Sequence, residues 1–396
     1  MYYLLYTFLT LWSVADNVPR PTQFVVVNSS GKHKDIQLFH SRRGAEAWLT
    51  ASPVEETALI CKKKKVFFVA GDQIQSVDLD HPKVETNVGT LPKELVAAMG
   101  SSVRHFLRPS PDGAYLAWPG SSDIQIRGIG TTFSKSITPD PGTRIVHPLF
   151  WRPGGAEIAY VTQNPAGTVW LHFHPLTKVN PRLSLAAVSG TKGTVLAFDL
   201  HFSADGRMAA LNMDIVLDPR KTVRYFLVLD VETGVLQTLS PSWKLEKFHG
   251  FSAKGELVLS GRISGNMSLY YWNPANPKTP HLVETLLKRE VYDYYANMDI
   301  TLLHTAGQKC SERARLISLT RYAKDHRLLK WAEWAEVVAL DASRVWGIFR
   351  AGGACNDTRP ALYLMKMDGS GLLDEMPKGR FSVLQSASPE QVAICD

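Results

Sequence analysis

The hydrophobic residues of this chain form short runs, separated by turns rich in Pro, Asp, Ser and Gly. The clearest example is Leu107–Trp118, LRPSPDGAYLAW, in which two apolar runs flank a Ser-Pro-Asp-Gly turn. Pro favours the first central position of a turn, Asp bonds nearby backbone, and Gly accepts a positive φ. The segment therefore predicts a β-hairpin.

The same hairpin pattern recurs along the chain. Clear copies have turns at Arg152–Gly155, Ser203–Gly206, Ser252–Gly255 and Ser388–Gln391, and weaker copies have them at Lys62–Lys65, Asn297–Asp299 and Asp341–Arg344. The turn centres lie at positions 63, 111, 153, 204, 253, 298, 342 and 389, so successive copies are 42 to 51 residues apart. A period of roughly 40–50 residues with several strands per repeat is typical of the blades of a β-propeller.

The strand–SPDG–strand repeat resembles the TolB-type propeller repeat, which is a relative of the WD repeat. The resemblance covers most of the chain from about residue 55 onward. It implies an all-β propeller of four-stranded antiparallel blades. It implies no particular function, because propellers of this type serve many roles.

The two ends of the chain predict how the propeller closes. Strand-like segments near the N-terminus lack an inner hairpin, and strand-like segments at the C-terminus lack outer strands. These segments are Phe24–Val27, Asp35–Phe39 and Ala45–Leu49 at one end, and Phe381–Leu384 and Val392–Cys395 at the other. We expect them to pair in one shared blade, which leaves no open sheet edge. Seven complete blades and this composite make eight; seven is the alternative if the Lys62–Lys65 hairpin does not begin a blade.

Helical signal is scarce and is confined to two short segments. Pro92–Met99 and Asp325–Glu336 are the best helical candidates. Length alone would suggest two or three domains, but a propeller is one domain whatever its blade number, so residues 23–396 are expected to form a single propeller domain.

The first residues resemble an export signal. Tyr2–Ala15 is apolar, carries no charge and ends in Ser13-Val14-Ala15, which fits cleavage after Ala15. It is shorter than the roughly 20 residues that span a bilayer, so we expect no membrane-spanning segment. Residues 16–22 then form a linker, and the protein is periplasmic or secreted. The alternative is that residues 1–15 pack on the propeller and the protein is cytoplasmic.

Composition changes this picture little. The 44 basic and 37 acidic residues give a net charge of +7, spread along the chain, and the only dense run is Lys62–Lys65. Because no aromatic platform or recognition helix accompanies that run, we interpret it as a solvated hairpin tip and expect no nucleic-acid partner. A monomer is expected.

The four cysteines permit two disulfides in an exported chain. Cys310 and Cys355 lie in matched loops 45 residues apart, in the segments Ala306–Cys310 and Ala351–Cys355. Cys61 and Cys395 lie on inner strands of blades that closure makes adjacent. We predict Cys310–Cys355 as the favoured bridge and Cys61–Cys395 as the second candidate. Four free thiols are the alternative.

The sequence contains no established catalytic, cofactor-binding or metal-binding motif. Four histidines, His105, His147, His201 and His249, fall on the first strands of four successive blades. Imidazoles that converge there could bind a metal or an anion or transfer protons. Their spacings from the turns differ, however, and strand alternation would then point them in different directions. We therefore predict no catalytic residue, metal or cofactor.

Three functions fit these observations. We expect a non-catalytic scaffold that binds a protein or peptide partner at the loops or the channel mouth. The alternatives are a metal-dependent lyase or hydrolase that acts on saccharides in the channel, and an accessory propeller of a separate catalytic chain.

Overall fold

The structure is a computed structural model of the chain. It describes residues 23–28, 35–50, 56–62, 64–99, 106–176, 184–188, 193–239, 244–252, 254–263, 265–273, 280–285, 289–295, 300–305, 317–320, 323–327, 334–340, 346–352, 361–366, 374–375 and 392–395. The chain divides into two compact units. The first contains Met1–Asn87 and Lys288–Asp396, and the second contains Val88–Leu287. The expected signal segment 1–15 and linker 16–22 lie outside the described residues.

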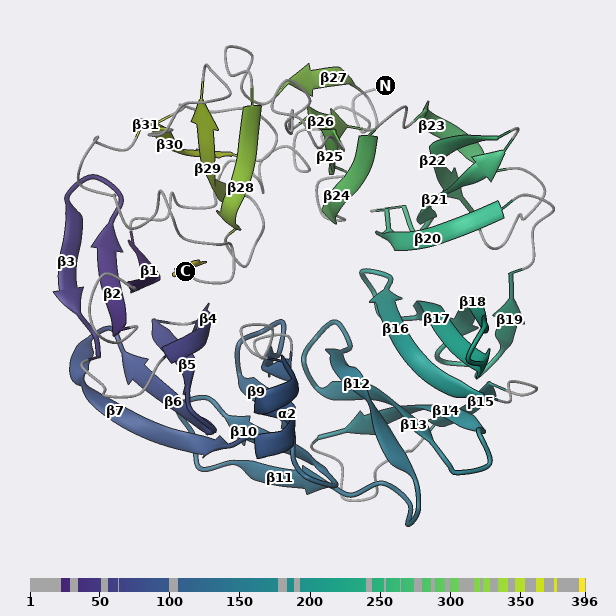
Figure 1. Cartoon of the computed structure of the whole chain (residues 1–396), viewed down its shortest axis with the longest axis horizontal. Helices are drawn as coiled ribbons and strands as arrows, with labels where there is room; N and C mark the ends of the chain where they lie inside the picture. Colours follow the sequence, from purple (N-terminus) through teal and green to yellow (C-terminus); the bar gives the residue numbers. More distant parts are fainter. Residues whose placement is uncertain are drawn as a thin grey trace, which may run out of the picture. The chain divides into compact units, whose positions relative to one another are not determined.

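The described residues form eight four-stranded antiparallel sheets (Figure 1). In the second unit, each sheet is built from consecutive strands. Its first sheet contains β8 (Arg108–Pro109), β9 (Tyr115–Pro119), β10 (Ile124–Gly128) and β11 (Ser134–Ile137). The next contains β12 (Arg144–Trp151), β13 (Glu157–Gln163), β14 (Val169–Pro175) and β15 (Ser184–Val188). The third contains β16 (Thr194–Phe202), β17 (Met208–Asp218), β18 (Lys221–Asp230) and β19 (Leu236–Thr238). The fourth contains β20 (Lys244–Phe251), β21 (Leu257–Ile263), β22 (Asn266–Trp272) and β23 (His281–Thr285).

The sheets of the first unit come from both ends of the chain. One contains β4 (Glu56–Lys62), β5 (Lys65–Ala70), β6 (Gln73–Asp78) and β7 (His81–Thr90), whose last residues belong to the second unit. Another contains β24 (Arg289–Tyr295), β25 (Ile300–Thr305), β26 (Ile317–Thr320) and β27 (Ala323–Arg327). A third contains β28 (Trp334–Leu340), β29 (Trp346–Gly352), β30 (Ala361–Lys366) and β31 (Asp374–Glu375).

The last sheet of the first unit joins the two ends of the chain. Its strand order is β3 (Gly44–Trp48), β2 (Asp35–His40), β1 (Gln23–Asn28) and β32 (Val392–Ile394). Strand β1 pairs antiparallel with β32, with Phe24 opposite Ile394 and Val26 opposite Val392. The predicted pairing of N-terminal with C-terminal strands is therefore confirmed. The predicted strand Phe381–Leu384 lies outside the described residues.

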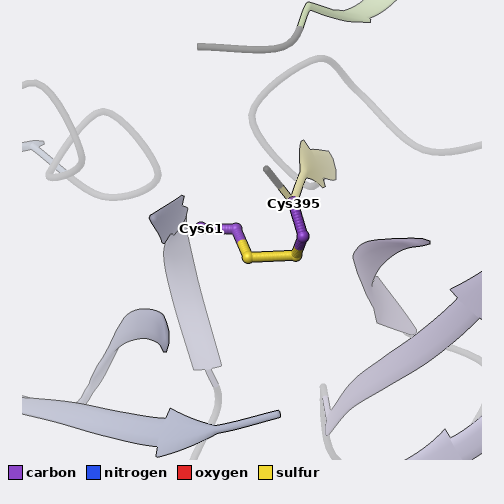
Figure 2. The surroundings of a disulfide bond; sticks show 2 residues. All are labelled: Cys61 and Cys395. Carbon is purple, nitrogen blue, oxygen red and sulfur yellow. A yellow bond between two sulfur atoms is a disulfide. The ribbon is translucent and has the colours of Figure 1, made fainter. Parts of the chain in front are cut away.

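A disulfide bond between Cys61 and Cys395 links this closing sheet to β4 (Figure 2). The Cα atoms of the two cysteines are 5.0 Å apart, and both side chains lie in an apolar cluster with Val25, Val66 and Phe68. The second candidate bridge of the sequence is thus the one found. The favoured pair, Cys310 and Cys355, lies outside the described residues and stays a prediction.

The predicted hairpin turns recur with the same hydrogen bonds. Ser110 Oγ donates to Asp112 Oδ1 over 2.6 Å and accepts from the backbone N–H of Tyr115 over 2.9 Å. Ser203 Oγ donates to Asp205 Oδ1 over 2.6 Å and likewise accepts from a strand N–H over 2.9 Å. These side chains satisfy backbone groups that the strands leave unpaired, so they fix where each first strand ends.

The two helical predictions have different outcomes. The helix α2 (Lys93–Met99) confirms the first one. The second, Asp325–Glu336, is wrong, because its ends lie in strands β27 and β28, which pair with β26 and β29. A helix this short gains little from its own hydrogen bonds, so sheet pairing prevails. Within the described part of the chain, no helix has the length and apolar character needed to cross a membrane.

Candidate functional site

The second unit brings the first strands of its sheets together. Strand β12 lies beside both β8 and β16, and β16 lies beside β20. The labels β12, β16 and β20 follow one another in the same order in Figure 1. Polar side chains on these strands can therefore meet, although they are far apart in the sequence.

The first strands of these four sheets have equivalent positions close to their turns. Arg108, Phe150, His201 and Gly250 each stand two residues before the first turn residue, and each pairs with the second strand of its sheet. In β20 a register shift falls between Phe248 and Gly250, so His249 is an inserted residue. A β-bulge of this kind re-aims a side chain. It explains how His249 joins the row despite its different distance from the turn.

Asp199 is the charged centre of this group. Its carboxyl Oδ2 lies 3.1 Å from His201 Nε2. Burial raises the pKa of Asp199, but the interactions with His201 and Lys247 outweigh burial and leave the pKa below its ordinary value. Asp199 pairs with Asn212, and Lys247 occupies the equivalent position opposite Ser260. The two opposite charges thus stand at matching positions on neighbouring strands.

His249 is held in a neutral form. Its Nε2 lies 3.0 Å from the hydroxyl of Ser260. Burial, together with the nearby charge of Lys247, lowers the pKa of His249 to about 3. At neutral pH the ring therefore carries no charge and contributes hydrogen bonding only.

Arg108 contributes a partly buried positive charge. Its guanidinium carbon lies 5.6 Å from the centroid of the Phe150 ring, a cation–π arrangement. Its backbone carbonyl accepts a 2.7 Å hydrogen bond from Trp151 Nε1, which ties β8 to β12. Burial lowers the pKa of Arg108, and attraction to Asp199 opposes that effect. Among the described residues, no group accepts a hydrogen bond from Arg108 Nε.

These residues define what we call the first-strand cluster: Arg108, Asp199, His201, Lys247 and His249. Of the four histidines singled out in the sequence, the structure brings His201 and His249 together near Asp199. His147 instead packs edge-on against Phe106, with ring centroids 5.1 Å apart. Burial and the charge of Arg144 lower the pKa of His147 to about 4. His105 lies outside the described residues.

Sequence reasoning missed Arg108, Asp199 and Lys247. A signal was available for two of them, because Asp199-x-His201 and Lys247-x-His249 each place a charged residue two positions before a histidine, ahead of consecutive turns. Side chains two residues apart on a strand share a face, so each pair predicts a charged group beside a histidine. The two pairs differ by one residue in their distance from the turn, and the sequence alone does not show that the extra residue is a bulge at His249.

The described residues contain no group of three or more His, Cys, Asp or Glu side chains placed to hold a metal ion. In the first-strand cluster Arg108 and Lys247 are positively charged, Asp199 is negatively charged and lies against His201, and His249 is neutral.

No family model and no curated protein matches this chain. Solved structures do match it. The Porphyromonas gingivalis dipeptidyl peptidase 4 structure is 10% identical and has a TM-score of 0.59, with 92% of this chain and 59% of that chain covered. The dihydro-heme d1 dehydrogenase NirN in complex with DHE is 15% identical, with a TM-score of 0.50 and coverage of 93% and 78%. A prolyl endopeptidase is 11% identical, with a TM-score of 0.50 and coverage of 82% and 50%.

At these identities the likeness concerns the fold alone. The chain shares the β-propeller fold with the propeller domains of proteases, and its four-stranded antiparallel sheets are consistent with that fold. This chain spans 59% of the length of the dipeptidyl peptidase 4 structure and 50% of the prolyl endopeptidase structure. The activities named for those longer proteins are therefore not assigned to this chain.

Proposed function

We propose that this chain is an exported, eight-bladed β-propeller that binds a protein or peptide partner through the first-strand cluster and catalyses no reaction. Eight four-stranded sheets support the blade number, with the closing sheet of β1 to β3 and β32 as the eighth blade. Propellers offer a rigid scaffold on which loops and strand ends carry the binding groups.

The observation that carries this proposal is the concentration of charge on strands β8, β16 and β20. The Asp199 side chain is 43% exposed and the His201 side chain is 22% exposed, so both are accessible from solvent. Lys247 is exposed and Arg108 is partly buried. Charged groups at such positions add nothing to an apolar core. They are suited to recognising a polar partner.

The Cys61–Cys395 disulfide supports export. Disulfides form and persist in oxidising compartments and are rare in the cytosol. The apolar Tyr2–Ala15 segment agrees with this location.

Site-specific photo-crosslinking tests the proposed binding. We would place a photoreactive phenylalanine analogue at Lys247 in one variant and at Lys221, exposed on the β17–β18 hairpin, in a matched control. Both variants would be expressed in the native host and irradiated. We expect one discrete crosslinked species from position 247, competed by purified wild-type protein, and none of that mass from position 221. Equal products from both positions, or none from position 247, would refute the proposal.

The two other functions remain predictions. An accessory propeller would give a crosslinked partner that is itself a catalytic chain, identifiable by mass spectrometry. A metal-dependent lyase or hydrolase would carry stoichiometric metal that is lost in a His147→Ala variant, as metal analysis of the purified protein would reveal.

A further inference from the structure

We infer that the first-strand cluster binds a single carboxylate of its partner, so that the segment recognised is an acidic peptide. The inference rests on the proposed function and specifies the chemistry of the partner. It is carried by the arrangement of Arg108, Asp199 and Lys247.

The Nε–H group of Arg108 is a hydrogen-bond donor that has no acceptor among the described residues. The guanidinium carbon lies over the Phe150 ring, 5.6 Å from its centroid, and this contact holds the charged group in place. Within the described part of the chain, Nε finds no hydrogen-bond acceptor. Buried polar groups in folded proteins are almost always hydrogen-bonded, and a guanidinium group pairs best with a carboxylate.

Asp199 does not act as the hydrogen-bond acceptor for Arg108 Nε. Its carboxyl Oδ2 already lies 3.1 Å from His201 Nε2. Burial raises the pKa of Asp199, but the interactions with His201 and Lys247 outweigh burial and leave the pKa below its ordinary value. Asp199 therefore stays ionised and is engaged by its neighbours on β16 and β20. What it supplies to Arg108 is a longer-range attraction.

The balance of charge selects the ligand. Arg108 and Lys247 carry two positive charges, Asp199 carries one negative charge, and His249 is neutral at pH 7 because burial lowers its pKa to about 3. The cluster therefore attracts an anionic group. The planar guanidinium of Arg108 matches the two oxygens of a carboxylate, and the phosphoserine peptide below tests the phosphate alternative.

Fluorescence anisotropy with four labelled hexapeptide amides tests the inference. They differ only in one central residue, which is glutamate, glutamine, lysine or phosphoserine. We expect the glutamate peptide to bind at least tenfold tighter than the glutamine peptide, since hydrogen bonds to charged groups are worth roughly 1.5–3 kcal/mol. Raising NaCl from 50 to 300 mM should weaken this binding.

Three variants locate the binding. Arg108→Gln and Lys247→Gln should each weaken glutamate-peptide binding about tenfold. Lys244→Gln is the matched control, because Lys244 is exposed on the same strand and pairs with Glu246 over 2.8 Å. It should change the affinity less than twofold. Because Lys247 is exposed, its variant keeps the test valid even if Arg108→Gln fails to fold.

Four results would overturn the inference: no binding of the glutamate peptide at 1 mM, equal binding of the glutamine peptide, preference for the lysine peptide, or tenfold preference for the phosphoserine peptide. An equal loss in Lys244→Gln and Lys247→Gln would also overturn it. The crosslinking experiment is independent. If position 247 crosslinks but acidic peptides are not preferred, the carboxylate inference fails and the proposed function stands. If acidic peptides bind but position 247 gives no crosslink, the proposed protein or peptide partner is refuted and the carboxylate site stands.

Discussion

Removing the Cys61–Cys395 bond should cost the protein more stability than removing a disulfide usually does. The two cysteines are separated by 334 residues, and their side chains are only 5% and 8% exposed. The perturbation is the double variant Cys61→Ala/Cys395→Ala, which removes the bond and leaves no buried thiol. Alanine keeps both positions apolar, so the loss reports mainly the missing cross-link.

The magnitude follows from the size of the loop that the bond closes. Loop-closure entropy for a loop of 334 residues corresponds to about 6 kcal/mol at 25 °C. With an unfolding entropy of roughly 2.1 cal/mol/K per residue over 396 residues, this lowers the Tm by about 7 °C.

Differential scanning calorimetry under non-reducing conditions measures the effect. Peptide mapping of the unreduced wild-type protein first establishes that Cys61 and Cys395 are linked. Reduced wild-type protein is the control and should melt near the reduced double variant. If mapping finds the bond and the variant nevertheless melts with the wild type, the loop-closure reasoning is refuted. The same mapping tests the predicted Cys310–Cys355 bridge.

Three further predictions concern stability. Burial lowers the pKa of His172 to about 4, so at this position the unfolded chain binds an extra proton as the pH falls from 6.5 to 4. His172 should therefore contribute about 3 kcal/mol to the fall in unfolding free energy over this range, and in urea titrations His172→Gln should lose about that much less than wild type. Burial raises the pKa of Glu56 to about 7, so between pH 4.5 and 7 the folded chain keeps a proton that the unfolded chain releases, and the fold is destabilised as the pH rises. In the same titrations the unfolding free energy of Glu56→Gln should exceed that of wild type by about 3 kcal/mol at pH 8 and equal it at pH 4. Gly155→Ala would place Cβ 2.6 Å from Asp112 Oδ1, whereas the Cβ of Gly142→Ala would meet nothing within 4 Å. Because both positions have positive φ, either substitution should lower the unfolding free energy by about 1–2 kcal/mol, and thermal melts should show the larger loss for Gly155→Ala.

The sequence predicted features that are local or that follow from counting strands. The Ser110 and Ser203 turns were predictable because each turn type depends on the residues within it. The β1–β32 pairing was predictable because each end of the chain had strands without partners. The segment Asp325–Glu336 was misjudged because strand pairing with distant residues decided its structure.

The candidate site was predictable only in part. His201 and His249 were recognisable as first-strand residues. His201 lies two residues from Asp199 on the same strand, whereas the approach of His249 depends on the bulge in β20. One inserted residue reverses the face on which a side chain lies. Arg108 gains its significance from the Phe150 ring on a neighbouring sheet, a contact between residues that no local pattern relates.

The β1–β32 pairing also has a consequence for biosynthesis. The second unit is one continuous segment, Val88–Leu287, and every strand of its four sheets is available as soon as that segment has left the ribosome. Strand β1, in contrast, waits for β32, which is translated more than 350 residues later. At about 5–20 residues per second, that delay is on the order of 20–70 s. During it, the Val25–Val27 backbone of the nascent chain is exposed to pairing with other molecules, so chaperones that shield this strand would determine the yield of folded protein.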